Sequence, residues 1–114
     1  MEGIEKVDKP WGYELVWAKT EKYVGKIMHI NSGHRMSLQY HEKKEETIFV
    51  MSGLLLVWEK SGEEHIKLNP GQTYHVVPGQ VHRFGASEEQ GCMILEVSTP
   101  EIEDVVRLED DYER

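Results

Sequence analysis

The fold of this chain is decided by the stretch Gly33-His34-Arg35-Met36-Ser37-Leu38-Gln39-Tyr40-His41, which Glu46 follows after four residues and Gly53 after six more. Apolar and polar residues alternate over 36–41, so we predict a strand there. Residues two apart on a strand point to the same face, and Gln39 and His41 can therefore present donor atoms to one point. Glu46 and His82, which follows the Pro78-Gly79 turn, would complete a four-residue metal site.

Short strands and tight turns continue along the rest of the chain. Turns are predicted at glycine and proline sites such as Ser52-Gly53 and Asn69-Pro70-Gly71. The only helical signal is 100–106, where Pro100 precedes three acidic residues. The pattern predicts an all-β sandwich or barrel with a short helical or irregular C-terminal tail. The predicted strands are 13–18, 23–30, 36–41, 47–51, 54–59, 64–68, 73–77, 82–84 and 92–98.

Composition limits the possible partners and compartment. A chain of 114 residues is expected to form one domain, 1–114. The net charge of −8 argues against binding to nucleic acid or to an anionic membrane surface. The single Cys92 cannot form an internal disulfide, the first residues lack signal-peptide features, and no apolar run is long enough to span a bilayer. We therefore expect a cytoplasmic protein.

Several predicted strands are apolar on both faces. In the strand 47–51, Ile48 and Val50 occupy one face and Phe49 and Met51 the other, and the strand 54–59 shows the same pattern. Such a strand needs a second packing partner, which is either another sheet of the same chain or a second subunit. Because exposed apolar area on a small protein usually marks an interface, a homodimer is favoured.

The motifs above resemble those of the cupin superfamily. The stretch 33–53 is similar in spacing to the first cupin motif, with Gln39 where that motif has its first histidine. The stretch 71–86 is similar to the second motif, with His82 in the histidine position, Val77 where a proline is common and Ala86 where asparagine is common. The resemblance implies a cupin double-stranded β-helix, that is, a jelly-roll barrel.

A narrower resemblance is to the cupin domain of the type II mannose-6-phosphate isomerases, which also occurs fused to mannose-1-phosphate guanylyltransferases. The nucleotidyltransferase part has no counterpart in these 114 residues, so that activity is not expected. The matching segments span nearly the whole chain and are 9–13, 37–41, 78–83, 94–97, 103–107 and 110–112.

The expected cofactor is one divalent metal ion held by Gln39, His41, Glu46 and His82. Imidazole suits zinc and the later first-row metals, whereas carboxylate and amide oxygens also accept manganese or iron. The donor set alone thus restricts the metal loosely, and nickel or cobalt would also fit. The resemblance implies zinc, because mannose phosphate isomerases use such a Gln, His, Glu, His set.

The resemblance also suggests roles for charged residues outside the metal site. Isomerisation of an aldose to a ketose needs a base near the metal, and Glu96 and Lys26 are the candidates. A sugar phosphate needs cations, for which Arg83 and Arg107 are the preferred candidates over Lys9 and Arg35. Strand alternation turns Arg83 away from His82, so Arg83 would reach the pocket only through a local bend.

Three functions from different classes remain open. The first is a metal-dependent isomerase interconverting mannose 6-phosphate and fructose 6-phosphate. The second is a metal cupin that binds a sugar or nucleotide sugar without turnover, and the third is a small metal-dependent oxygenase of the cupin class. The terminal segments favour the first two. The short chain leaves catalysis uncertain, because full enzymes of this family usually carry more chain to close a lid over the substrate.

Overall fold

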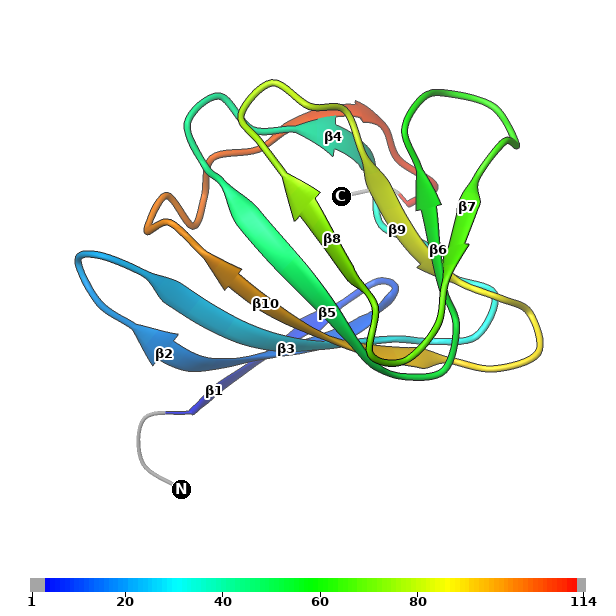
Figure 1. Cartoon of the computed structure of the whole chain (residues 1–114), viewed down its shortest axis with the longest axis horizontal. Coiled ribbons are helices and arrows are strands. Elements are labelled where there is room, and N and C mark those ends of the chain that lie inside the picture. The colour runs from blue at the N-terminus through cyan, green and yellow to red at the C-terminus, as the bar shows by residue number, and fades with distance from the viewer. Residues whose placement is uncertain (1–3, 113–114) are drawn as a thin grey trace.

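The computed structural model describes residues 4–112, and within this range the regular secondary structure consists of β-strands. Figure 1 shows one large twisted sheet that faces two smaller sheets. Among the described residues there is accordingly no helix that could cross a membrane. The strands are β1 (Glu5–Lys9), β2 (Gly12–Lys19), β3 (Val24–Ile30), β4 (Leu38–Tyr40), β5 (Glu46–Ser52), β6 (Leu55–Trp58), β7 (Ile66–Leu68), β8 (Thr73–Val76), β9 (Arg83–Ala86), β10 (Cys92–Ser98) and β11 (Val106–Glu109).

The large sheet has six strands in the order β1-β2-β3-β10-β5-β8, and the smaller sheets are β7-β6-β9 and β11-β4. Every pairing is antiparallel. Neighbours such as β3 and β10 are far apart in sequence, which is expected when a chain winds between two facing sheets. The core between the sheets contains fully buried side chains such as Ile30, Ile48, Val57 and Ile94.

One tight turn depends on the freedom of a glycine. Gly53 joins β5 to β6 with φ +81°, in the left-handed region that other residues avoid. A Cβ atom at Gly53 would lie 2.3 Å from the carbonyl oxygen of Gly91. The turn predicted at Ser52-Gly53 therefore also allows two loops to approach closely.

The structure differs from the predicted strands at both ends of the chain. β1 and β11 were not predicted. The tail after Pro100 takes the irregular form of the two predicted alternatives: residues 102–103 form a turn, and the chain then enters β11 at Val106. Pairing with β4 stabilises β11, and such a long-range partner cannot be read from local sequence.

The two strands that are apolar on both faces have different surroundings. On β6, Leu56 and Trp58 are buried, as their inward neighbours Leu55 and Val57 are. On β5, Phe49 and Met51 are 42% and 43% exposed. The second packing partner of β6 is therefore part of the same chain, whereas the outer side of β5 faces solvent in the single chain.

Candidate metal centre and its cavity

A cavity of about 110 Å³ lies between the inner face of the large sheet and the smaller sheets. Its lining combines apolar side chains, among them Met28 and Phe84, with an unusual number of charged ones. All four predicted metal ligands line it: Gln39, His41, Glu46 and His82. The structure thus brings together residues that the sequence separates by more than forty positions.

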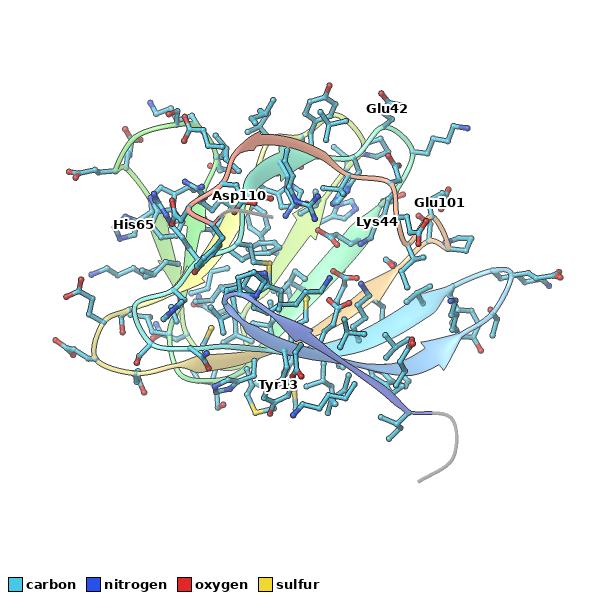
Figure 2. All side chains as sticks on the ribbon, turned by 180° about the vertical axis from the view of Figure 1, so that it is seen from behind. Tyr13, Glu42, Lys44, His65, Glu101 and Asp110 are labelled. Atoms are coloured by element: carbon cyan, nitrogen blue, oxygen red, sulfur yellow. The ribbon has the colours of Figure 1, made fainter. Side chains whose placement is uncertain are left out.

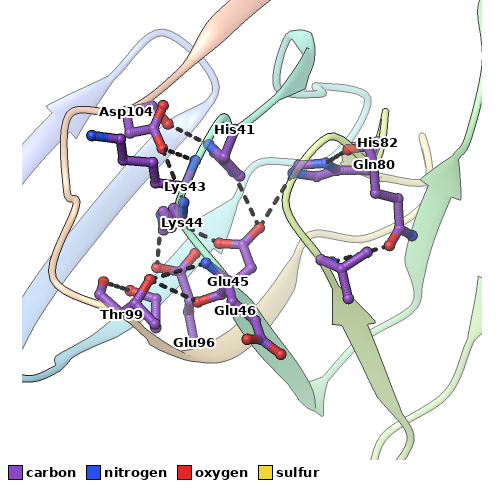
Figure 3. A network of polar contacts seen from close by, with 12 residues as sticks. His41, Lys43, Lys44, Glu45, Glu46, Gln80, His82, Glu96, Thr99 and Asp104 are labelled. Carbon is purple, nitrogen blue, oxygen red and sulfur yellow. Dashed lines mark hydrogen bonds and ion pairs between the residues drawn. The ribbon is translucent and has the colours of Figure 1, made fainter.

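Three of these side chains converge on one point. The potential ligand atoms of His41, Glu46 and His82 all lie within 4.8 Å of one another, and all three residues are buried. The Nε2 atoms of His82 and His41 lie 3.2 and 3.6 Å from the same oxygen, Oε1 of Glu46 (Figure 3). This separation is typical of groups that share one small cation.

Backbone pairing brings Gln39 to the same place. Gln39 and His82 exchange two backbone hydrogen bonds, 3.0 and 2.9 Å long, in an isolated antiparallel bridge. Side chains of directly opposite residues in such a pair lie on the same face. Gln39 therefore projects toward the cavity beside His82 and offers an amide oxygen as a fourth donor.

Backbone carbonyl groups orient both imidazole rings. Nδ1 of His41 lies 2.5 Å from the carbonyl oxygen of Asp104, and Nδ1 of His82 lies 3.0 Å from that of Gln80. A carbonyl oxygen only accepts hydrogen bonds, so each Nδ1 donates its proton there and each ring turns its Nε2 atom toward Glu46. This is the usual arrangement around metal-binding histidines.

The donor set fits a divalent cation. Two imidazole nitrogens and a carboxylate oxygen meet at one buried location, and there they can share one positive charge, either a proton or a metal ion. Burial tends to raise the pKa of Glu46, but contacts with His41, His82 and Lys44 hold it well below its ordinary value. Glu46 is thus an anion at this site, and two imidazoles, a carboxylate and an amide suit zinc, manganese or iron.

A buried charge network adjoins the metal centre. The ammonium group of Lys44 lies 3.3 Å from Oε2 of Glu46 and 3.3 Å from Oε2 of Glu96, the latter without hydrogen-bond geometry. Burial and the nearby charge of Glu46 raise the pKa of Glu96 to about 8, against the opposing effects of Lys44 and Lys26. A carboxyl group with such a pKa can both accept and donate a proton near neutral pH.

The two predicted base candidates lie on the inner face, directly opposite each other on β10 and β3. Both Glu96 and Lys26 are buried and line the cavity. The ammonium group of Lys26 is 3.3 Å from Oε1 of Glu14, which also receives a contact of 4.0 Å from Lys9. Lys26 is therefore already engaged in an ion pair, whereas Glu96 has an oxygen without a hydrogen-bond partner.

The two arginines predicted to bind substrate have different locations. Arg107 is exposed on β11, opposite Gln39 of β4, and lines the cavity. Arg83 does not line it, so the predicted contact of Arg83 with substrate is corrected. Strand alternation directs the buried Arg83 to the opposite face from His82, as the sequence pattern predicts. No local bend at Arg83 turns its side chain back toward the cavity.

Arg83 holds the C-terminal segment instead. Its Nε donates to the carbonyl oxygen of Met36 at 2.8 Å and its Nη2 to that of Glu109 at 3.2 Å. Arg35, the other arginine considered for phosphate binding, forms a bidentate pair with Asp111 at 2.6 and 3.0 Å. Both guanidinium groups are thus used to fix the segment that follows β11.

Two residues of the site were missed at the sequence level. Lys44 lies in the turn between β4 and β5, where two-residue parity does not apply. Asp104 accepts backbone hydrogen bonds from Glu42, Lys43 and Lys44 at 3.1, 2.7 and 2.9 Å. Figure 3 shows Asp104 beside Lys43 and Lys44. The position of Lys44 two residues before Glu46 is a weak indication that both side chains lie near the site. Nothing in the sequence around Asp104 indicates that it contacts the 42–44 turn.

A comparison of the sequence with models of known families finds one that matches residues 1–110, described as "Mannose-6-phosphate isomerase C-terminal". Among curated proteins the chain is similar to "Xanthan biosynthesis protein XanB" of Xanthomonas campestris pv. campestris, with 30% identity over 112 residues. This match covers 96% of the chain and 24% of the relative, so the chain spans about a quarter of that protein.

Solved structures support the fold. KdgF from Halomonas sp. superposes with a TM-score of 0.75 at 18% identity, covering 87% of this chain and 90% of that one. A Klebsiella pneumoniae protein with a double-stranded β-helix domain gives 0.74 at 22% identity, covering 93% and 86%. A cupin-2 domain protein from Shewanella frigidimarina gives 0.64 at 22% identity, covering 80% and 82%. The predicted cupin double-stranded β-helix is thereby confirmed.

Proposed function

Because the chain belongs to the family of mannose-6-phosphate isomerase C-terminal domains, we propose that it is a metal-dependent isomerase that interconverts mannose 6-phosphate and fructose 6-phosphate. The observation that carries the proposal is the convergence of His41, Glu46 and His82 next to the buried carboxyl group of Glu96. One cavity thus combines a fitting metal site with a proton carrier.

Gln39, His41, Glu46 and His82 would hold the ion, and zinc is our first choice. A divalent ion bound there would polarise the sugar carbonyl group and offset negative charge that develops on its oxygen. The carbonyl groups of Asp104 and Gln80 keep both imidazole rings in the tautomer that binds metal.

Glu96 is our candidate for moving the proton between the two adjacent sugar carbons. Its raised pKa makes it a stronger base than an ordinary carboxylate, and at neutral pH it can return the proton to the neighbouring carbon. Lys26 is less suited, because its ammonium group is paired with Glu14 and a base needs a free lone pair. Lys44 would bridge Glu46 and Glu96 with its ammonium group and offset the charge of their carboxyl groups.

The phosphate group is expected at the rim of the cavity. A volume of about 110 Å³ is well below the roughly 300–1,000 Å³ of small-molecule pockets, so a hexose phosphate must extend beyond it. Arg107 is exposed at the lining, and within residues 4–112 its guanidinium group forms no ion pair. Lys9 is the nearest alternative cation, although it lies 4.0 Å from Glu14.

The small cavity also supports a second candidate function. A shallow site that leaves part of the sugar in water suits binding without turnover, because water access exposes a reactive intermediate to side reactions. In this case the chain would bind a sugar or nucleotide sugar through the metal centre and the rim cations.

The test combines metal analysis with a coupled assay. The purified protein is expected to contain one metal ion per chain and to convert mannose 6-phosphate to fructose 6-phosphate. Glu96→Gln should keep the metal and lose at least about 100-fold in kcat, the usual contribution of general acid–base catalysis. Stoichiometric metal without turnover would favour the binding function, and iron with oxygen consumption would favour an oxygenase.

A further inference from the structure

The outer face of the six-stranded sheet is the largest regular surface that the metal centre does not use. Figure 1 shows none of the other described strands over this face. Figure 2 shows Tyr13 on the outer side of the sheet and Lys44 on the inner side. Because side chains alternate along each strand, the two faces can be read directly from the register.

The register aligns apolar residues across four neighbouring strands. Leu15 on β2 is opposite Ile27 on β3, Ile27 is opposite Leu95 on β10, and Leu95 is opposite Phe49 on β5. Val97, on the same face of β10, is 49% exposed. The result is a continuous apolar row at the centre of the sheet.

In a soluble protein, the charged residues of a sheet usually lie on its solvent-facing side, but on these strands they lie on the inner side. Glu14, Lys26, Glu46 and Glu96 all point inward, where they line the cavity. Within the described residues, no Asp, Glu, Lys or Arg side chain of β2, β3, β5 or β10 belongs to the outer face between Tyr13 and Phe49. In a chain with 30% charged residues, such a neutral surface calls for a partner.

We propose that this face pairs two copies of the chain in a two-fold symmetric dimer. Each copy carries a net charge of −8, so two copies repel one another except where the contact surface is uncharged. A two-fold interface places the same patch on both partners, and a neutral apolar row is complementary to itself. This inference gives the homodimer expected from the sequence a specific surface, and it does not depend on the proposed activity.

The size of the face is sufficient for a specific dimer. Six strands spaced about 4.8 Å apart, with an average length of about six residues at about 3.3 Å each, cover roughly 500 Å². Two such faces in contact would remove about 1,000 Å² from water, which matches the roughly 1,000 Å² expected of a biological interface.

The borders of the face have the polar character of an interface rim. On β1, Lys6 and Asp8 lie 3.8 Å apart on this side, next to Leu15 and Tyr13. At the other edge His75 of β8 contacts Glu45 at 2.5 Å. An apolar centre with charged borders is the usual anatomy of a protein–protein contact.

Trp17 supplies an anchor of the kind that dominates binding energy. Its ring packs on Gly25, where a Cβ atom would come within 2.6 Å of the ring, and the side chain remains 43% exposed. The contact with Gly25 thus already positions the indole of Trp17 against the sheet in the single chain. Aromatic anchors of this type are enriched among the residues that contribute most to interfaces.

Analytical ultracentrifugation of the metal-loaded protein from about 1 to 100 µM tests the proposal. The parent should sediment as a dimer of twice 13.3 kDa, and Phe49→Glu should weaken the dimer at least tenfold. The variant is expected to fold, because in the single chain Phe49 already faces solvent. Its unchanged melting temperature as a dilute monomer and its unchanged metal content would verify this.

Ile66→Glu provides the matched control. Ile66 is 42% exposed, as Phe49 is, but lies on β7 outside the proposed face. The control should remain dimeric. A parent that is monomeric at 100 µM, or a Phe49→Glu protein that dimerises as the parent does, would overturn the proposal. So would an equal loss of dimer in the Ile66→Glu control.

Discussion

Residue by residue, the cavity of this barrel can hold buried charges because the charged groups described there have counterparts. Glu46 faces Lys44 and two imidazoles, and Lys26 faces Glu14. An unpaired charge in such an environment would cost several kcal/mol, whereas a paired one is tolerated. The metal centre is therefore part of a charge balance that any substitution must disturb.

The two imidazoles provide the most direct test of the site. His82→Ala should abolish stoichiometric zinc binding, because it removes a buried donor atom from the three-residue cluster. With zinc at about 100 times its dissociation constant, the parent gains about 2.7 kcal/mol of folding free energy that the variant lacks. Calorimetry should show zinc raising the melting temperature of the parent by about 10 °C and that of the variant much less.

His65→Ala is the control for this experiment. Its ring also has Nδ1 2.7 Å from a backbone carbonyl, that of Glu63, but it is exposed on the surface. Zinc should stabilise this variant as it does the parent. Equal zinc content in the His82→Ala protein and the parent would refute the assignment of His82 as a ligand.

Glu96 predicts a pH dependence of stability in the metal-free protein. Its folded-state pKa of about 8 exceeds its ordinary value of 4.5, so its contribution to stability is complete below that value and is lost as pH rises through 8. Lys44, Lys26 and Glu46 face the group in both variants. Relative to Glu96→Gln, the parent should lose up to about 5 kcal/mol of unfolding free energy between pH 4.5 and 8, at about 1.4 kcal/mol per pKa unit.

Denaturant titrations in EDTA at several pH values measure this difference. The comparison with Glu96→Gln cancels titrations that both proteins share, including those of the imidazoles. A difference that stays constant with pH would show that Glu96 is ionised in the folded protein at neutral pH. In that case Glu96 would lose its advantage as the proton carrier.

The sequence anticipated part of the site because strand geometry is local. The spacing of Gln39 and His41 on one strand predicted that both face the cavity, and both line it. Lys44 and Asp104 could not be predicted, because their positions depend on a turn and on a tail that meets it from sixty residues away. Strand alternation correctly placed Arg83 on the opposite face from His82, and the local bend that could have brought Arg83 into the cavity is absent at this position.

At the level of elements, the C-terminal segment acts as a strap across the barrel mouth. Its residues Ile102, Val105 and Arg107 line the cavity. The segment is fixed by hydrogen bonds to the 41–45 turn and by the contacts of Arg35 with Asp111 and of Arg83 with Glu109. The strap also carries the carbonyl group that orients His41. Its conformation and the geometry of the metal centre are therefore coupled.

Asp104 is the residue through which this coupling should be measurable. Hydrogen bonds from the backbone N–H groups of Lys43, Glu42 and Lys44 lower its pKa and fix the strap against the turn. Asp104→Ala should release this contact and weaken zinc affinity about tenfold, the lower end of the range for groups that orient metal ligands.

Competition with a chelator measures the zinc affinity of this variant. Glu103→Ala, on the exposed neighbouring position, should bind zinc as the parent does. A normal affinity in Asp104→Ala would show that His41 keeps its orientation without the strap. A melting temperature measured in EDTA separates a loss of orientation from a general loss of stability.

Element prediction succeeded where alternation and turn residues coincide, as for β5 and β10. It failed for β1 and β11, and it left the 100–106 segment open between a helical and an irregular tail. The acids after Pro100 are typical of a first helical turn, but in the folded chain one of them, Asp104, accepts hydrogen bonds from the 42–44 backbone. Tertiary contacts thus decide between the helical and irregular tails that the local sequence left open.

On the scale of the whole molecule, the two faces of the large sheet carry different kinds of residues. The inner face holds the charges that the metal centre needs, and the outer face carries the apolar surface that a partner copy would cover. This division explains why β5 is apolar on both sides in a chain with mean hydropathy of only −0.57. The apolar residues concentrate on this sheet and in the core.

The proposed dimer predicts an unusual dependence on salt. Two chains of charge −8 repel each other at long range, while the contact face itself is uncharged. Added salt screens the repulsion, because the Debye length falls from about 30 Å at 0.01 M to about 8 Å at 0.15 M ionic strength, and it leaves the apolar contact intact. Sedimentation equilibrium should show the dimer becoming several-fold tighter between these two conditions. The Ile66→Glu control, with one more negative charge per chain, should show a steeper dependence. A dimer that weakens with salt would instead be held by ion pairs between copies, as at the Lys6 and Asp8 border, and would argue against the apolar row as its centre.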